Sequence, residues 1–320
     1  MNSKKNIKVT VMIPTYNQVD FIREAIGSAI MQTYPNLEIL VGDDGSTDGT
    51  EKVILNIADP RIKYIRNPIN LGRTENYRNL VCNHATGDYV VNLDGDDYYT
   101  DPNFISEAVR LIDAAPDVMI VAARAKWHHL GKSYVSDIPK TNYASGLEIM
   151  RGLPDPKFFF KHMATVYRRA EAVKIGFYSS NSNSSDWESL YRLALRGQVR
   201  YLDRIVGVWR IHNLNESSTV DYRKLMENLE IWPAIYKDAV EHGMTERSAR
   251  LLCNKCIAYF VSTFAVRVSR KGNDALATFL KLVFAQYSSA AISLIASPKC
   301  LARLTLCFLG FYRKGKLVGA

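Results

Sequence analysis

Residues 89–97 read Tyr89-Val90-Val91-Asn92-Leu93-Asp94-Gly95-Asp96-Asp97. The apolar first part predicts a short buried strand over Tyr89–Leu93. Acids that follow such a strand lie at the edge where open α/β sheets bind ligands. Carboxylates in this turn can hold a divalent cation and the ribose or sugar part of one nucleotide, because Mg²⁺ and Mn²⁺ prefer oxygen ligands. An acidic turn without a ligand fits the same residues, since Asp and Gly are common turn formers.

Short apolar runs alternate with helical periodicity on both sides of this stretch. Four further strands are predicted at Lys8–Ile13, Leu37–Asp43, Ile62–Arg66 and Val118–Ala123. Helical spacing lies between them, at Phe21–Ile30, after Ser46–Gly49, at Asn76–Ala85 and at Asn103–Ala114. This alternation predicts an α/β fold with a mostly parallel central sheet flanked by helices. The less regular stretch Trp127–Ser185 is expected to return to that sheet, before a helix at Trp187–Arg196 and a strand at Gln198–Arg210.

Helical periodicity dominates from about Tyr222 to the end. We therefore expect one domain over residues 1–220 and a mainly helical C-terminal region over 221–320. Ala275–Ala296 is nearly continuous apolar sequence, but Lys281, Gln286 and several serines make it marginal as a membrane span. A core-packing or interfacial helix fits it better. After Asp274 there are no acids and six basic residues, which favours an anionic membrane surface as a partner: Lys281, Lys299, Arg303, Arg313, Lys314 and Lys316.

The overall composition is that of a folded protein, with 47% hydrophobic and 23% charged residues, and it excludes wholesale disorder. The formal net charge of +9 favours polyanionic partners. The basic tail lacks the aromatic pattern of a nucleic-acid module, so no nucleic acid is expected. Five cysteines without a disulfide-like framework favour a reducing compartment. Met1–Asn6 is basic, but the following apolar run is too short for a secretory signal. We therefore expect a cytoplasmic protein, peripheral on the inner membrane face.

Two further strand ends carry polar side chains. Residues 41–48 read Val41-Gly42-Asp43-Asp44-Gly45-Ser46-Thr47-Asp48, where an Asp can accept a hydrogen bond from a base NH and the helix start suits an anion. A cap on the next helix by Asp44 or Ser46 is the structural alternative. Residues 13–17 read Ile13-Pro14-Thr15-Tyr16-Asn17, where Tyr16 can stack on a nucleobase or simply pack.

In chain order, these motifs are joined by Asn70-Leu71-Gly72, Arg78-Asn79 and Gly87-Asp88-Tyr89. The combination closely resembles the family 2 glycosyltransferases, whose nucleotide-sugar fold is called GT-A. The resemblance covers roughly residues 7–215 and leaves out the last hundred residues. It implies a nucleotide-sugar site made of Pro14, Thr15, Tyr16, Asn17, Asp43, Asp44, Arg73, Asp94, Gly95 and Arg210.

The resemblance also implies individual roles. Asp43 would read the base, Asp94 would face the ribose or sugar, and Asp96 would ligate a metal, Mn²⁺ or Mg²⁺. Arg73 would contact the base or a phosphate, and the nearby Arg78 can do similar work. A solvated helix face is the alternative for either arginine.

Two motifs near the end of the resemblance carry the remaining chemistry. Ser184-Ser185-Asp186-Trp187-Glu188 matches a family motif in which Asp186 is the general base, although Ser185 replaces the usual first acid. A helix cap is the alternative for Asp186, and Glu188 is a second candidate base. Val208-Trp209-Arg210-Ile211-His212 matches an aromatic-Arg-x-His ending, which implies that Arg210 contacts phosphate and His212 contacts the metal or the diphosphate. A purely structural histidine is the alternative.

The sequence therefore predicts an inverting glycosyltransferase that moves a sugar from a UDP- or dTDP-linked donor to an acceptor hydroxyl. The acceptor would be a saccharide or lipid-linked saccharide in surface polysaccharide or glycolipid synthesis. A sugar nucleotidyltransferase and a non-catalytic nucleotide-binding scaffold are the alternatives. A dinucleotide oxidoreductase is disfavoured, because no GxGxxG follows the first strand.

Overall fold

The computed structural model describes residues 6–129, 131–212 and 221–312. The chain divides into two compact units. The first unit comprises Met1–Ile149, Asp155–Asn181 and Ser185–His212, and the second comprises Met150–Pro154, Ser182–Ser184 and Asn213–Ala320. The predicted domain boundary after residue 220 and the basic residues Arg313, Lys314 and Lys316 lie outside the described residues.

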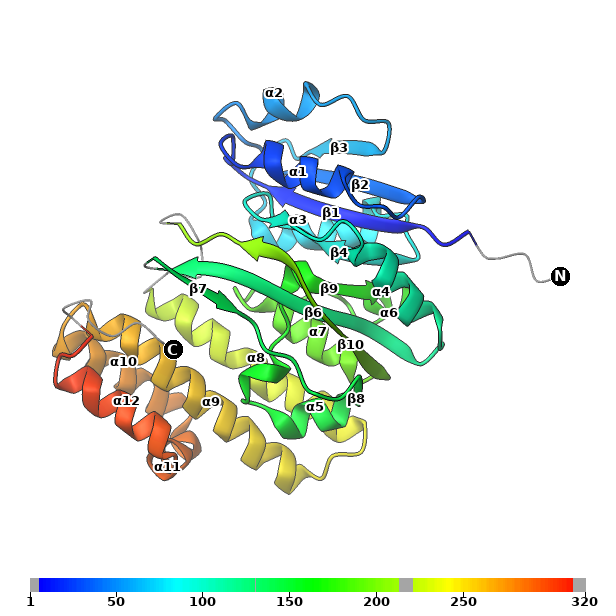
Figure 1. The fold of residues 1–320 in the computed structure, drawn as a ribbon. Helices are drawn as coiled ribbons and strands as arrows, with labels where there is room; N and C mark the ends of the chain where they lie inside the picture. Colours follow the sequence, from blue (N-terminus) through cyan, green and yellow to red (C-terminus); the bar gives the residue numbers. More distant parts are fainter. Residues whose placement is uncertain (1–5, 130, 213–220, 313–320) are drawn as a thin grey trace. The chain divides into compact units, whose positions relative to one another are not determined.

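The first unit is built around one curled sheet (Figure 1). Its strand order is β3-β2-β1-β4-β9-β6-β10-β5. In addition, β7 pairs with β6, and β8 pairs with β10. The strands are β1 Val9–Thr15, β2 Leu37–Asp43, β3 Ile62–Arg66, β4 Tyr89–Asn92, β5 Tyr98–Tyr99, β6 Val118–His129, β7 Lys132–Val135, β8 Tyr143–Ser145, β9 Thr165–Arg168 and β10 Gln198–Trp209. The strands β3, β2, β1 and β4 are parallel, as are β6 and β10. β9 runs antiparallel to both β4 and β6 and joins the two parallel parts.

Helices cover both faces of the parallel part. Strands β1, β2 and β4 are buried along their whole length, which explains their continuous apolar sequence. Val11, Ile39 and Val91 share a core with α1 and α4, whereas Gly42 on β2 lies against Leu80 on the opposite side. The helical elements of this unit are α1 Ile22–Ile30, α2 Thr50–Leu55, α3 Arg73–Asn79, the π-helix η1 Leu80–His84, α4 Phe104–Asp113, the first half of α5 Gly146–Gly152, η2 Pro156–Phe158, η3 His162–Ala164, α6 Arg169–Lys174 and α7 Ser185–Ala194.

The predicted fold class is confirmed, and the predicted strands agree with β1, β2, β3, β4 and β6 at their starts or along most of their length. The expectation that Trp127–Ser185 returns to the sheet is also confirmed, by β7, β8 and β9. The predicted helix at Asn76–Ala85 differs in detail. It starts earlier, at Arg73, and its second half is a π-helix.

The second unit is helical, and α9 packs against α8, α10, α11 and α12. Its helices are α8 Tyr222–Glu241, α9 Glu246–Ser269, α10 Asn273–Gln286, α11 Ser288–Ala296 and α12 Pro298–Phe308. Side chains cap three of them, because Asp221, Thr245 and Ser297 each accept a hydrogen bond from a first-turn backbone N–H. Cys253 and Cys256 are buried on α9, where burial raises the pKa of Cys253 to about 12.

The prediction of one apolar helix over Ala275–Ala296 is wrong. The chain breaks at Tyr287, and α10 and α11 meet at an angle of 117°. Among the described residues, α9 is the one helix long and apolar enough to cross a membrane by itself, although 61% of its apolar window is buried in the protein. The apolar character of α9 is therefore explained by its central position in the helical unit.

Candidate functional site

Three predicted stretches meet at the carboxyl edge of the parallel strands. Thr15 pairs in register with Asp43, and the Thr15 carbonyl accepts a hydrogen bond of 2.9 Å from the N–H of Asp44. On the other side, the Pro14 carbonyl accepts a 3.1 Å hydrogen bond from the N–H of Gly95. The end of β1 thus lies between the acids that follow β2 and those that follow β4, at the position where such sheets bind ligands.

Asn17 links the loops after β1 and β2. Its φ of 51° is in the left-handed region, which Asn tolerates better than most residues. Its N–H donates to the hydroxyl of Ser46 at 2.9 Å, and its side-chain oxygen accepts from the N–H of Thr47 at 2.8 Å. Tyr16, the residue before it, is 44% exposed, so its ring is accessible at this edge.

The two acids after β2 have different surroundings. Asp43 is fully buried and accepts hydrogen bonds of 2.8 Å from the N–H of Ser46 and 2.9 Å from the hydroxyl of Tyr64. Asp44 accepts from the N–H groups of Leu71 and Gly72, both at 2.9 Å, and so holds the loop that leads into α3. Neither acid caps α2. The carboxylate that accepts from the first turn of that helix belongs to Asp48, which bonds the N–H of Thr50 at 3.0 Å.

Asp94 joins a buried polar cluster. Its Oδ1 accepts hydrogen bonds from the hydroxyl of Tyr77 and from the side-chain amide of Asn92, the latter at 2.9 Å. The same amide lies 3.1 Å from Nδ1 of His162, whose Nε2 lies 2.6 Å from the hydroxyl of Tyr178. Since an amide nitrogen only donates, His162 Nδ1 is the acceptor and Nε2 carries the hydrogen. Burial lowers the pKa of His162, which agrees with a neutral ring.

The first turns of α3 and α7 meet beside this cluster. The hydroxyls of Thr74 and Ser185 are 3.3 Å apart, which brings the neighbouring residues Arg73 and Asp186 to the same place. The Arg73 guanidinium carbon lies 5.6 Å from the ring centre of Tyr77. Burial lowers the pKa of His162, and the negative charge of Asp186 opposes this by raising it. Arg73, Asp94 and Asp186 therefore surround one group of buried rings.

The two alternative residues are engaged elsewhere. Arg78 donates to the backbone carbonyl of Tyr178 at 2.7 and 2.9 Å and pairs with Glu75. Glu188 is 5% exposed and pairs with Arg192 on its own helix at 3.0 Å. Both side chains therefore stabilise the loop and helix that carry the site.

The fold brings together Asp96 and His212, which are 116 residues apart in the sequence. His212 Nε2 lies 2.8 Å from Oδ2 of Asp96, and the His212 ring stacks on Phe21 at 5.0 Å. Burial and then the charge of Asp94 raise the pKa of Asp96, and the contact with His212 opposes this shift. The Asp96 oxygen and the His212 nitrogen therefore lie side by side, and a divalent transition metal accepts ligands of both kinds.

Further protein ligands do not complete this pair. Within residues 6–129, 131–212 and 221–312, no group of three or more His, Cys, Asp or Glu side chains is arranged to hold a metal ion. A pair of protein ligands fits a cation that takes its remaining oxygens from a bound phosphate, as Mg²⁺ commonly does. The donors present therefore fit a metal shared with a ligand better than a structural metal.

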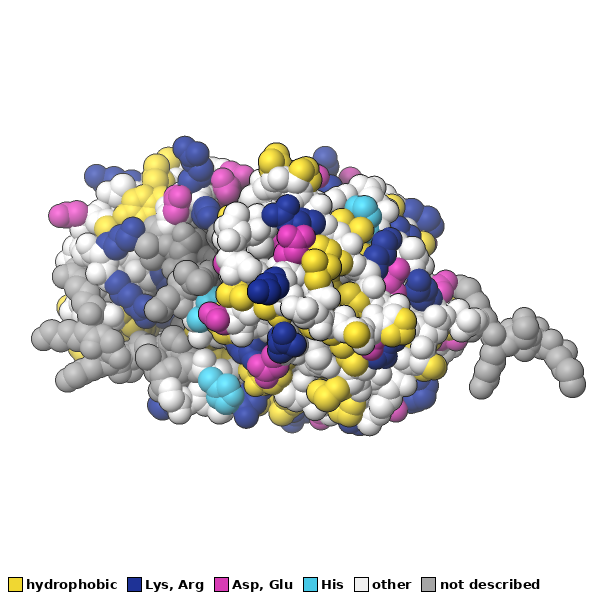
Figure 2. All heavy atoms as spheres, turned by 90° about the horizontal axis from the view of Figure 1, so that it is seen from above, with side chains coloured by type: hydrophobic (Ala, Val, Ile, Leu, Met, Phe, Trp, Pro, Cys, Tyr) yellow, Lys and Arg dark blue, Asp and Glu magenta, His cyan; other side chains and the backbone are white. Residues whose placement is uncertain are grey.

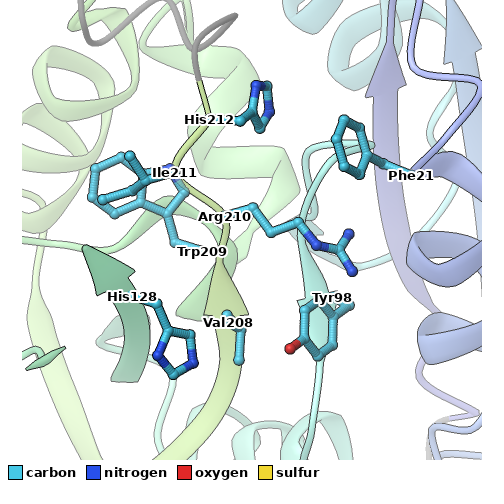
Figure 3. Close-up of a pocket in the computed structure, with 8 residues that line it drawn as sticks. All are labelled: Phe21, Tyr98, His128, Val208, Trp209, Arg210, Ile211 and His212. Carbon is cyan, nitrogen blue, oxygen red and sulfur yellow. The ribbon is translucent and has the colours of Figure 1, made fainter. Parts of the chain in front are cut away.

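Arg210 lies on the other side of Asp96. Its backbone N–H donates to Asp97 at 2.9 Å, and its guanidinium donates to the carbonyl of Asp96 at 2.8 Å and pairs with Glu24. The guanidinium also lies 4.4 Å from the ring centre of Tyr98. Figure 3 shows Arg210 reaching between Tyr98 and Phe21, at a hollow of about 270 Å³ that Trp209 and His212 also line. In this arrangement Arg210 fixes the turn that carries the acids.

Sequence reasoning missed the ring cluster of Tyr77, His162 and Tyr178. Tyr77 lies one turn after Arg73 on α3, so helical spacing could have indicated it. His162 comes from η3 and Tyr178 from the turn after α6, and no local pattern connects either residue to Asp94. Only the pairing of β9 between β4 and β6 places these segments beside the site.

Comparison with known proteins identifies the family of this chain. A family model described as glycosyl transferase family 2 matches residues 10–188, more than half of the chain. An uncharacterized protein of Mycobacterium bovis is 28% identical over 251 residues, which are 75% of this chain and 71% of that protein. The Escherichia coli UDP-Glc:alpha-D-GlcNAc-diphosphoundecaprenol beta-1,3-glucosyltransferase WfaP is 42% identical over 91 residues, which are 28% of this chain and 36% of that enzyme.

Solved structures show the same fold. S. aureus TarS 1–349 in complex with UDP-GlcNAc superposes with a TM-score of 0.65 at 18% identity, over 97% of this chain and 91% of that one. A mannosyltransferase of Pyrobaculum calidifontis in complex with GDP-Man and Mn²⁺ gives a TM-score of 0.59 at 18% identity, over 97% and 86%. The chain therefore belongs to family 2 of the glycosyltransferases, and it is an enzyme of the GT-A fold that transfers a sugar from a nucleotide-sugar donor.

Proposed function

We propose that this enzyme transfers a sugar, with inversion, from a UDP- or dTDP-linked donor to a hydroxyl of a saccharide or lipid-linked saccharide. The observation that carries the proposal is the convergence of Asp94, Asp96, Arg73 and Asp186 around the ends of β1, β2 and β4. The donor named for TarS is UDP-GlcNAc, and the E. coli relative is named for UDP-Glc and a diphosphoundecaprenol acceptor. Both names support a UDP-linked donor, and the second supports a lipid-linked acceptor.

The donor nucleotide would lie across the carboxyl ends of β1 and β2. Asp43 is buried and accepts one hydrogen bond at each oxygen, from Ser46 and Tyr64, and its remaining lone pairs would accept a base NH. The exposed ring of Tyr16 can stack on the base. Pro14, Thr15, Asn17 and Gly95 form the backbone frame of this edge. Asp44 would act through the loop that positions Arg73, because its carboxylate is occupied by that loop.

Asp186 is proposed as the general base. It lies in the first turn of α7, where the helix N-terminus favours a carboxylate, and it is only partly buried. The acceptor oxygen attacks the anomeric carbon of the donor as its proton passes to Asp186, and the bond from that carbon to the diphosphate oxygen breaks. A single displacement of this kind inverts the anomeric centre. Base assistance contributes about 10²- to 10⁴-fold in rate.

Asp96 and His212 would hold the divalent ion, either Mn²⁺ or Mg²⁺, together with the donor diphosphate. The ion supplies positive charge that stabilises the leaving diphosphate. The P. calidifontis neighbour is described with Mn²⁺, which supports a metal in this role. Arg210 would add positive charge on the same side once its guanidinium turns from Glu24.

The decisive experiment compares Asp186→Asn with the unaltered enzyme. We expect the release of nucleoside diphosphate with acceptor present to fall by about 10²- to 10⁴-fold, while donor binding in the presence of Mn²⁺ is retained. Asp203→Asn, at an exposed position away from the site, is the matched control. If Glu188→Gln lost turnover and Asp186→Asn did not, the base would be Glu188.

The product also separates this proposal from its alternative. A glycosyltransferase releases a nucleoside diphosphate, whereas a sugar nucleotidyltransferase releases or consumes pyrophosphate. Incubation with UDP- and dTDP-sugars, followed by chromatography of the nucleotides, distinguishes the two reactions. Pyrophosphate in place of nucleoside diphosphate would contradict the proposed transfer.

A further inference from the structure

Beyond the exposed serines of its first turn, helix α11 has apolar residues on two opposite sides. Ala290 and Leu294 are buried against the rest of the helical unit, while Ile292 and Ile295 on the opposite side are 74% and 66% exposed. The helix contains no charged residue. The outward side of a helix in a globular protein is ordinarily polar, so this exposed side indicates a surface that meets something other than water.

Helix α12 repeats the pattern. Its inward side carries Cys300, Leu304 and Cys307, all buried. Leu301 and Phe308 on the same helix are 44% and 45% exposed, and Leu309 and Phe311, which follow it, are 66% and 50% exposed. We call this set the apolar outer face; it consists of Ile292, Ile295, Leu301, Phe308, Leu309 and Phe311.

The charges that the described chain carries after Asp274 are all positive, although Glu230 on α8 accepts a 3.3 Å hydrogen bond from Gln286 at the end of α10. Lys281 on α10 and Lys299 in the first turn of α12 are exposed, and the sequence contains no acid after Asp274. Elsewhere the charges are mixed: Figure 2 shows one face of the molecule on which Lys and Arg side chains lie scattered among acidic and apolar ones. Apolar helices whose own charges are all basic are complementary to an anionic lipid leaflet.

Two other occupants fit less well. A membrane span needs about 20 apolar residues. α11 is only 9 residues long and α12 only 11, and the chain bends sharply between α10 and α11. A second copy of this chain would place the same face against itself in a two-fold pair. Such a pair would bring the lysines of one copy close to those of the other, and neither α11 nor α12 contributes an acid to neutralise them.

We infer that the apolar outer face of α11 and α12, with Lys281 and Lys299 beside it, docks on an anionic lipid bilayer without crossing it. The helices would lie in the plane of the interface, with the apolar side chains among the acyl chains and the lysines at the headgroups. The inference rests on the helical unit alone and does not depend on the assignment of the donor, the metal or the base.

The test is flotation of the full-length protein with vesicles of phosphatidylcholine alone and with added phosphatidylglycerol. We expect binding to the anionic vesicles, little binding to the neutral ones, and release by high salt. Equal binding to both vesicles, or no binding to either, would overturn the inference. Binding that resists both salt and alkaline extraction would indicate a span and would also overturn it.

Variants at exposed positions separate docking from folding. Ile292→Ser with Ile295→Ser should lower vesicle binding by at least about tenfold, since each buried apolar side chain contributes strongly, and Lys281→Gln or Lys299→Gln should lower it by about fivefold each. Leu55→Ser, 66% exposed on α2, and Lys52→Gln on the same helix are the matched controls and should bind unchanged. Equal losses from the controls would contradict the assignment of this face.

Self-association is measured on the same variants. Light scattering of the unaltered protein without lipid should give one mass that does not change on substitution of Ile292 and Ile295. A dimer that the double substitution converts to a monomer would show that this face binds a second copy of the chain, and would overturn the inference of lipid binding. The release of nucleoside diphosphate from a soluble donor should be unchanged in all the variants, which shows that they are folded.

Discussion

Tyr77 donates its phenolic hydrogen to Asp94 from inside a buried cluster of rings. Burial raises the pKa of Tyr77 well above its ordinary value, and the charge of Asp94 adds to the shift, so the hydroxyl remains a donor at neutral pH. Asn92 donates to the same oxygen of Asp94. One oxygen of this carboxylate is thereby fixed by protein groups, which leaves the other for the contact that we propose with the donor.

Tyr77→Phe should therefore weaken the orientation of Asp94 while keeping the ring beneath Arg73. We expect KM for the donor to rise about tenfold, because a hydrogen bond to a charged group is lost, with little change in thermal stability. Steady-state release of nucleoside diphosphate measures the effect. Tyr134→Phe, on β7 and stacked on Trp127, is the control. If Tyr77→Phe kept the KM of the unaltered enzyme, Tyr77 would not position Asp94.

Asp96→Asn removes half of the proposed metal pair. We expect donor binding in the presence of Mn²⁺ to fall to its level without metal, because the amide is a poor ligand and the imidazole alone binds weakly. Calorimetric titration of UDP with and without Mn²⁺ measures this. Asp137→Asn, at an exposed position, is the control, and a full metal effect retained in Asp96→Asn would remove this residue from the metal site.

The position of the acids at the strand ends could be predicted from local sequence, because an apolar run and the polar residues that follow it indicate the end of a buried strand. Asp43, Asp94 and Asp96 are of this kind. His162 is not, because its relation to Asp94 passes through Asn92 and depends on tertiary pairing. Hydrogen bonds between distant segments leave no periodic trace in the sequence.

At the level of elements, close packing of β2 against η1 depends on Gly42. A Cβ at this position would lie 2.4 Å from one Leu80 side-chain carbon and 2.5 Å from another. Leu80 is fully buried at the start of the π-helix and has little room to move. The absence of a side chain at Gly42 is therefore what lets this helical segment lie directly on the strand.

Gly42→Ala should destabilise the protein by about 1–3 kcal/mol, the usual cost of overpacking a core. Gly27→Ala is the matched control, because a Cβ at Gly27 meets nothing within 4 Å, and in the helix α1 it should be neutral or stabilising by up to about 1 kcal/mol. Urea unfolding followed by circular dichroism measures both. Equal stabilities of the two variants would show that Leu80 moves aside at little cost.

The strands β1, β2 and β4 could be predicted because burial on both faces makes their sequences largely apolar. The π-helix at Leu80–His84 and the break at Tyr287 could not, since both follow from packing against other elements. Apolar composition in Ala275–Ala296 indicated burial or a surface, but not where the helix would bend.

At the level of the whole molecule, Glu38 ties together the amino-terminal ends of the strands, opposite the site. Its carboxylate accepts from the hydroxyl of Thr10 at 2.6 Å and from the N–H of Thr86 at 3.0 Å, and it pairs with Lys8 at 3.3 Å. Burial alone would raise the pKa of Glu38, but the hydrogen bonds from Thr10 and Thr86 outweigh it, and the pKa is lowered.

The stability of the protein should depend on pH through this residue. The pKa of Glu38 in the folded protein is below its unfolded value of about 4.3. The ionised carboxylate therefore contributes its full stabilisation of the folded state above that pH, and this stabilisation is lost as the pH falls through the folded pKa. Glu38→Gln should therefore reduce the loss of thermal stability between about pH 5 and pH 3. Glu107→Gln, an acid at the surface of α4, is the control; an unchanged pH profile in Glu38→Gln would contradict the assignment.

The position of β9 between β4 and β6 has a consequence for the newly made protein. A ribosome releases the N-terminal part of a chain first, so the strands that carry Asp43 and Asp94 emerge well before Thr165–Arg168 and the helix that carries Asp186. Until then the edge of β4 has no partner and is open to wrong pairing. The nascent chain can gather the side chains proposed for the donor early, but it becomes competent to transfer a sugar only when this late strand closes the gap.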